Sequence, residues 1–176
     1  MNPITNKKDL ETTIDDIRNY AYAYLEKYSP SKQQLRIYLF KKLVRKNQKT
    51  SSKKEIFNLI DTVIFTLIDR KLLSDKYYSD VKSKAFFKRG YSLNKIRYNL
   101  IKKGIDEKYI KDSISKIKEN ESNPDFFSAI KICKRRRIGP CREENNRSLF
   151  YKKDISILAR SGFSYEISKK VLGIPK

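Results

Sequence analysis

The chain has 176 residues and a formal net charge of +21, with 39% hydrophobic residues, 35% charged residues and no histidine. The frequent, regularly spaced apolar residues exclude a disordered chain, and the missing histidine excludes histidine-based acid–base and nucleophilic catalysis. The most apolar stretch, residues 56–68, contains Asn58 and Asp61, which excludes a membrane span. The first 13 residues have no apolar core of the secretory type, so we expect a cytoplasmic protein.

In chain order, the sequence predicts an all-α protein of nine helices. Capping boxes, in which a serine and a residue three positions later satisfy the first helical amides, occur at Ser31 and Ser52. Only 5 Gly and 5 Pro are present, which disfavours a turn-rich sandwich or barrel. The predicted helices cover residues 9–28, 31–45, 53–72, 75–89, 92–103, 106–119, 124–137, 147–161 and 164–172.

A helix–turn–helix unit occurs three times, around the predicted cap serines Ser31, Ser92 and Ser164. A leucine follows each serine by eight residues, at Leu39, Leu100 and Leu172. This pattern predicts an elongated, curved array of three tandem three-helix repeats, at residues 9–74, 75–120 and 121–176. The predicted turn residues include these three serines. They also include the glycines expected at left-handed C′ positions, Gly90, Gly104 and Gly162, and the aromatic residues that precede a cap serine, Tyr91 and Phe163. We favour packing over base stacking for the two aromatics, as hydrophobic staples.

The helix predicted at 92–103 is amphipathic. Leu93, Ile96 and Leu100 form one apolar stripe, as Leu35, Leu39 and Leu43 do in the second helix, while Lys95, Tyr98 and Lys102 lie on the opposite side. Tyr98 is therefore the aromatic residue that we expect first as a surface contact.

Basic residues gather in three windows without acids, at 27–54, 81–105 and 126–142. Such windows predict a continuous positive track for a polyanion such as single-stranded nucleic acid. The alternative is a solvated, lysine-rich surface that reflects an AT-rich genome, although this leaves the clustered arginines at 135–137 unexplained. The predicted nucleic-acid or filament contacts are Lys88, Arg89, Lys95, Arg97, Tyr98, Lys102, Lys103, Lys134, Arg135, Arg136, Arg137 and Arg142.

No catalytic, metal or cofactor site is predicted. Cys133 and Cys141 lack the companions that a zinc site needs and are interpreted as reduced thiols. Acidic pairs occur, but a metal-dependent nuclease would place its acids inside a basic groove, and the basic windows contain none.

Two segments carry a resemblance to a known family. Residues 72–114, "LLSDKYYSDVKSKAFFKRGYSLNKIRYNLIKKGIDEKYIKDSI", resemble the central segment of the RecX family, bacterial regulators of the RecA recombinase. Residues 157–172, "ILARSGFSYEISKKVL", resemble the family's C-terminal turn and helix. The sequence departs from the family at 47–54, where a Lys-Gly-aromatic motif is common, and at Ser161, a position that is often basic.

The resemblance implies tandem three-helix repeats in a cytoplasmic protein without catalysis. It also implies binding in the groove of the RecA–single-stranded DNA filament, where the family damps ATP hydrolysis, strand exchange and coprotease function. We expect a monomer that binds the RecA filament and single-stranded DNA, with no membrane contact and no cofactor. A basic helical DNA- or RNA-binding protein without a RecA partner is the alternative, and charge does not separate the two.

Overall fold

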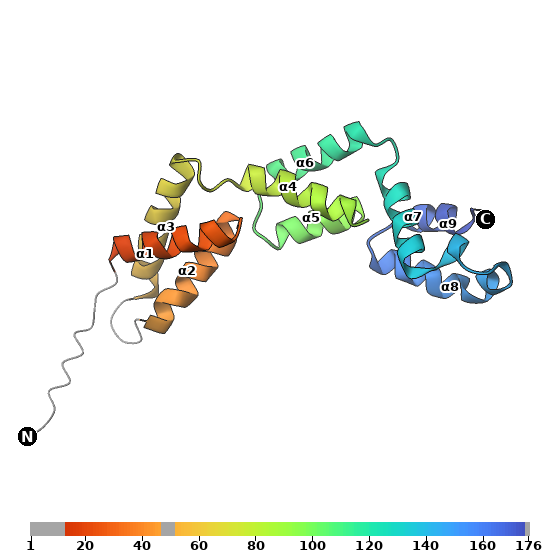
Figure 1. Cartoon of the computed structure of the whole chain (residues 1–176), viewed down its shortest axis with the longest axis horizontal. Coiled ribbons are helices and arrows are strands. Elements are labelled where there is room, and N and C mark those ends of the chain that lie inside the picture. Colours follow the sequence, from red (N-terminus) through yellow and green to blue (C-terminus); the bar gives the residue numbers. More distant parts are fainter. Residues whose placement is uncertain (1–12, 47–51, 175–176) are drawn as a thin grey trace, which may run out of the picture. The chain divides into compact units, whose positions relative to one another are not determined.

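A computed structural model gives the structure of the chain and describes residues 13–46 and 52–174. These two ranges are all-helical, which confirms the predicted fold class (Figure 1). No helix within them is both long and apolar enough to span a bilayer. The elements are α1 (Ile14–Lys27), α2 (Lys32–Lys46), α3 (Lys53–Asp69), α4 (Asp75–Lys88), α5 (Leu93–Ile101), α6 (Glu107–Asn120), α7 (Pro124–Arg136), the 3-10 helix η1 (Gly139–Cys141), α8 (Glu144–Arg160) and α9 (Tyr165–Leu172).

The chain divides into two compact units, with the boundary between Asp75 and Lys76. The N-terminal unit has one cluster of buried side chains, supplied by α1, α2 and α3. The C-terminal unit has two clusters, one from α4–α6 and one from α7–α9 with Ile138 and Phe163 of the connecting segments. The division into three repeats and the curvature of the array remain predictions.

Amphipathic stripes explain how each set of helices packs. In α2, Leu35, Leu39 and Leu43 repeat every four residues and are buried against α1 and α3, as predicted. In α5, Ile96 and Leu100 are fully buried by the same periodicity. Each such side chain contributes about 1.5–3 kcal/mol of hydrophobic stabilisation relative to an exposed one, so the stripes fix which face of each helix is turned toward solvent.

Helix boundaries follow the predicted capping signals. The capping box of Ser31 and Gln34 is present, as is that of Ser52 and Glu55. The side chains of Ser92, Asp106 and Ser164 each accept a hydrogen bond from an amide of the first turn that follows. The glycines after the helices have φ of +82° at Gly90, +72° at Gly104 and +87° at Gly162, which confirms the predicted left-handed C′ positions.

Two predicted starts were wrong. Thr13 has an extended backbone and forms a capping box with Asp16, so α1 begins at Ile14; residues 9–12 of the predicted helix lie outside the described residues. The helix predicted from residue 147 begins at Glu144, after the unpredicted 3-10 turn η1. Pro140 within that turn separates α7 from α8, because proline cannot continue a helical hydrogen-bond ladder.

Candidate functional site

The two Gly–aromatic–Ser turns of the C-terminal unit contact each other. The Ser92 hydroxyl accepts a hydrogen bond from the Lys95 amide at 3.1 Å and donates one to the Ser161 carbonyl at 3.0 Å. A Cβ at Gly162 would lie only 2.5 Å from the Ser92 Oγ. Glycine is therefore required at 162 both for its positive φ and for the close approach of the two turns.

Helix α7 also packs against the first of these turns. A Cβ at Gly90 would lie 3.2 Å from the Lys131 Cβ and 3.3 Å from the Ser128 carbonyl oxygen. The Asp125 carboxylate accepts a hydrogen bond from the Leu93 amide at 2.8 Å. Burial raises the pKa of Asp125 above its ordinary value, against the opposing effects of that hydrogen bond and of the Lys118 charge. The start of α5 is thus held by both α7 and the α8–α9 turn.

The aromatic residues of the two turns pack within the fold. Phe163 is buried in the core of the last three helices. Tyr91 is half-buried, and its ring stacks on that of Phe86 with the centroids 5.2 Å apart. Packing therefore accounts for both positions without a bound base.

The exposed face of α5 and its C-cap carries two lysine–tyrosine pairs. The Lys102 Nζ lies 4.4 Å from the centroid of the Tyr98 ring, and Tyr98 is 56% exposed. The Lys95 Nζ lies 5.0 Å from the centroid of the half-buried Tyr91 ring. A cation held over an aromatic face places a phosphate-binding group beside a surface on which a base can stack.

The other predicted contact residues surround this face and the end of α7. One hydrogen bond, from the Arg135 Nη1 to the Arg89 carbonyl at 3.0 Å, joins the two basic stretches. Arg137 ends α7 with a left-handed φ of 52°. The exposed side chains of this group are those of Lys88, Arg89, Arg97, Lys103, Lys134, Arg135, Arg136 and Arg137.

Arg142 has a different environment. Its Nε and Nη2 each donate to the Asp154 carboxylate at 2.8 Å, and the Gly139 amide donates to the same carboxylate at 2.9 Å. Asp154 is only 1% exposed. Burial alone would raise the pKa of Asp154, but the hydrogen bonds from Arg142 and Gly139 and the nearby charges outweigh burial and lower it. The guanidinium predicted to contact a polyanion is therefore engaged inside the fold.

Arg147 is a structural residue that the sequence analysis missed. Its guanidinium donates to the carbonyl oxygens of Pro140 at 2.8 Å, and of Arg142 and Ile174 at 3.4 Å. No local spacing signals this role, because the three acceptors come from two separate segments. Together Arg142 and Arg147 hold the irregular segment between α7 and α8.

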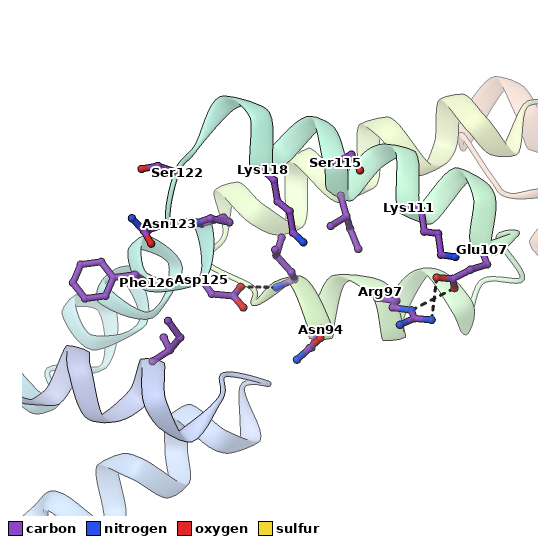
Figure 2. A pocket seen from close by; sticks show the side chains of 14 residues that line it. Asn94, Arg97, Glu107, Lys111, Ser115, Lys118, Ser122, Asn123, Asp125 and Phe126 are labelled. Atoms are coloured by element: carbon purple, nitrogen blue, oxygen red, sulfur yellow. Dashed lines mark hydrogen bonds and ion pairs between the residues drawn. The ribbon is translucent and has the colours of Figure 1, made fainter.

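A cleft of about 700 Å³ opens between α5, α6 and the start of α7 (Figure 2), and Ile167 of α9 is among its lining residues. Arg97 lines it and forms an ion pair with Glu107, with the Nη2 and Oε1 atoms 2.9 Å apart. Lys111 and Lys118 also line the cleft and were not predicted, although their seven-residue spacing places them on one face of α6. The cleft combines apolar side chains with three cations and with the acids Glu107 and Asp125, as a site for an amphipathic partner group requires.

The described part of the chain shows no metal-binding cluster, and its two cysteines differ in environment. Within residues 13–46 and 52–174, no group of three or more Cys, Asp or Glu residues is placed to hold a metal ion. Burial raises the pKa of Cys133 to about 12, so its thiol is protonated at neutral pH and is a poor nucleophile. Cys141 is exposed and is not in a disulfide bond.

The chain matches no protein-family model. It is 28% identical over 159 residues to the regulatory protein RecX of Myxococcus xanthus (strain DK1622), a match that covers 89% of this chain and 83% of that protein. The crystal structure of RecX from Lactobacillus salivarius superposes with a TM-score of 0.61 at 21% identity and covers 90% of this chain and 94% of that one. A second RecX crystal structure gives a TM-score of 0.58 at 20% identity, and the match covers 90% of this chain and 72% of that one. The structural matches show a shared fold.

Proposed function

We propose that this chain, which is similar to RecX regulatory proteins, is a RecX-type regulator that binds the RecA–single-stranded DNA filament and lowers RecA ATP hydrolysis, strand exchange and coprotease activity. The observation that carries the proposal is the match to a regulatory protein RecX along 89% of the chain. A regulator acts by binding, and the net charge of +21 suits a partner that carries nucleic acid.

In this proposal, the exposed face of α5 meets the anionic part of the filament. The Lys102–Tyr98 pair supplies both a cation and an exposed ring, so phosphate and base contacts are available at one place. Arg97, Arg135 and Arg142 are engaged with Glu107, the Arg89 carbonyl and Asp154, so we assign them to positioning. The proposed contact residues are Lys88, Arg89, Lys95, Tyr98, Lys102, Lys103, Lys134, Arg136 and Arg137.

The cleft of Figure 2 would serve the protein part of the same interface. Leu93, Ile114 and Ile167 give it an apolar lining, while Lys111 and Lys118 bring positive charge to it. A partner side chain with an apolar body and a neighbouring carboxylate fits this combination, because the apolar contact gives affinity and the charge pair gives orientation.

The test is a titration of this protein into the cognate RecA assembled on single-stranded DNA, with ATP hydrolysis as the readout. We expect hydrolysis to fall with increasing protein. We expect the variant Tyr98→Ala/Lys102→Ala/Lys103→Ala to need a higher concentration for the same effect.

A matched control removes an exposed tyrosine and two exposed lysines elsewhere in the C-terminal unit, Tyr165→Ala/Lys152→Ala/Lys169→Ala. It should inhibit as the wild type does. Unchanged ATP hydrolysis at every ratio of protein to RecA would overturn the proposal. If ATP hydrolysis did not change but the protein still bound the single-stranded DNA alone, the protein would be a nucleic-acid-binding protein without a RecA partner.

A further inference from the structure

The N-terminal unit carries a cleft of its own between α1 and α2, with a volume of about 540 Å³. Its lining consists of Tyr20, Tyr38, Lys41, Lys42 and Arg45, two aromatic residues and three cations without an acid. Tyr38, Lys41, Lys42 and Arg45 lie in the basic window 27–54 that the sequence predicts as part of a polyanion track, but none of the five residues was named among the predicted contacts. We refer to this site as the tyrosine cleft.

The register of α2 explains why these groups lie together. Tyr38, Lys41, Lys42 and Arg45 follow the spacing i, i+3, i+4, i+7, which places them on one face of the helix. The buried leucine stripe of α2 occupies a different face of the same helix. Packing of the core therefore fixes the direction in which the basic face points.

The rings of the tyrosine cleft are held in place by neighbouring groups. Tyr38 stacks on Tyr24, with the ring centroids 4.0 Å apart and the planes 17° from parallel. The Lys42 Nζ lies 4.3 Å from the centroid of the Tyr20 ring and 5.9 Å from that of Tyr38. An aromatic surface and a cation are thus positioned before any ligand arrives, which reduces the entropy lost on binding.

The charges of the tyrosine cleft are not balanced within the described part of the unit. Other cations of the same unit have acidic partners: Arg36 pairs with Asp61 and Arg18 with Asp15, both at 2.6 Å. Among residues 13–46 and 52–75, no carboxylate lies within 4.0 Å of the charged groups of Lys41, Lys42 or Arg45. Like charges four residues apart on a helix, as at Lys41 and Arg45, repel each other, and a bound polyanion would relieve that repulsion.

We propose that the tyrosine cleft binds single-stranded nucleic acid. Lys41, Lys42 and Arg45 hold consecutive backbone phosphates, and a base stacks against the rings of Tyr38 and Tyr20. A free phosphate would use only the cations, and an acidic peptide would have no planar group to place on the rings. The combination of both features favours a strand whose bases are unpaired. The proposal does not rest on the RecA interaction, because it is argued from a different unit and different residues.

The test uses the full chain and a fluorescein-labelled oligothymidine, with anisotropy measured over a series of salt concentrations and with no RecA present. For Lys41→Ala/Lys42→Ala/Arg45→Ala, we expect the slope of log affinity against log salt to fall by about 2, because each neutralised phosphate of a single strand contributes roughly 0.7 to the slope. Tyr38→Leu should weaken binding at every salt concentration and leave the slope unchanged. Tyr38→Phe, which retains the ring, should bind as the wild type does.

The charge-matched control is Lys32→Ala/Lys53→Ala/Lys54→Ala, which removes three exposed lysines of the same unit outside the cleft. Thermal melting of each variant by circular dichroism shows whether it is folded. Equal decreases in the salt slope for the cleft variant and the control variant would overturn the proposal. The basic face of α2 would then be a solvated surface without a specific site. If polyglutamate competed as well as unlabelled oligothymidine and Tyr38→Leu had no effect, the cleft would be a site for an acidic chain instead. The RecA assay plays no part in either outcome.

Discussion

The middle helices α4–α6 and the last helices α7–α9 share a Gly–aromatic–Ser turn, yet they use their basic residues differently. In the middle set, Lys102 and the Tyr98 ring beneath it face solvent. In the last set, Arg142 and Arg147 donate to a buried carboxylate and to backbone carbonyls. Arginine offers several donors in a fixed plane, which suits it to holding irregular backbone. The presence of an arginine in a basic stretch, as for Arg142 in the window 126–142, therefore does not by itself show that its charge is available to a ligand.

The largest expected effect tests the internal role of Arg142. Arg142→Ala leaves the Asp154 carboxylate buried without its bidentate partner, and we expect a loss of about 3 kcal/mol in the free energy of unfolding. Arg136→Ala, at an exposed position six residues away, should change it by less than about 0.5 kcal/mol. Urea unfolding followed by circular dichroism measures both. Similar values for the two variants would remove the distinction between internal and external arginines.

The next prediction concerns the two serine caps. Ser92→Ala removes a cap worth about 1 kcal/mol and the hydrogen bond to the Ser161 carbonyl, worth about another 1 kcal/mol. Ser164→Ala removes only the cap of α9, because its exposed hydroxyl accepts from the Ile167 amide. The decrease in unfolding free energy should thus be about twice as large at Ser92. Equal decreases would argue that the contact between the two turns adds no stability.

A smaller effect is expected in binding. Lys102→Ala/Lys103→Ala should lower the salt slope of single-strand binding by about 1.4, because each of the two lysines neutralises one phosphate and so contributes roughly 0.7 to the slope. Arg147→Gln removes a charge that is engaged with backbone carbonyls and should leave the slope unchanged. Anisotropy titrations over the same salt series compare the two. A fall in slope for Arg147→Gln alone would reverse the roles assigned to the middle and last helices.

The last prediction concerns the pH dependence of stability, which depends on two carboxylates, Asp80 in the middle helices and Asp154 in the last helices. Burial would raise the pKa of Asp80, but hydrogen bonds from Lys116 and Ser113 and the charges of Lys116 and Lys84 lower it, and Asp154 is lowered in the same way. Because the pKa of each carboxyl is lower in the folded state than in the unfolded state, the unfolded chain binds more protons in acid than the folded chain does. The stabilisation is therefore fully present above about pH 4, the ordinary carboxyl value, and is lost as the pH falls through the lowered pKa.

Melting temperatures measured from pH 6 down to pH 3 check this sign. The wild type should lose stability below about pH 4, and Asp154→Asn should show a shallower decrease over the same interval. Parallel curves for the two proteins would show that Asp154 does not titrate differently in the folded state.

Local signals in the sequence predicted much of the fold. Ser92 and Gly90 mark the end of one helix and the start of the next through hydrogen bonds that span only a few residues. The stripe of Ile96 and Leu100 depends only on helical periodicity, and so does the exposure of Tyr98. Features of this kind need no knowledge of how helices pack, which is why they were predictable.

The contacts that define the candidate sites depend on residues far apart in the chain. Arg142 was predicted as a surface cation because its partner Asp154 lies 12 residues further on, in another helix. Lys42 and Tyr20 meet only because α1 packs beside α2. Sequence periodicity gives the face of a helix but not the neighbour across it, so the tyrosine cleft was missed.

The hydrogen bond between Ser92 and the Ser161 carbonyl joins residues 69 positions apart, which has a consequence for synthesis. Because synthesis proceeds from the N-terminus, α4, α5 and α6 are made before residue 161. The nascent middle helices therefore emerge without the acceptor for Ser92 and without the turn that covers it. The hydrogen bonds of Ser92 are complete only once residue 161 is present, so the last helices finish a structure that the middle helices begin.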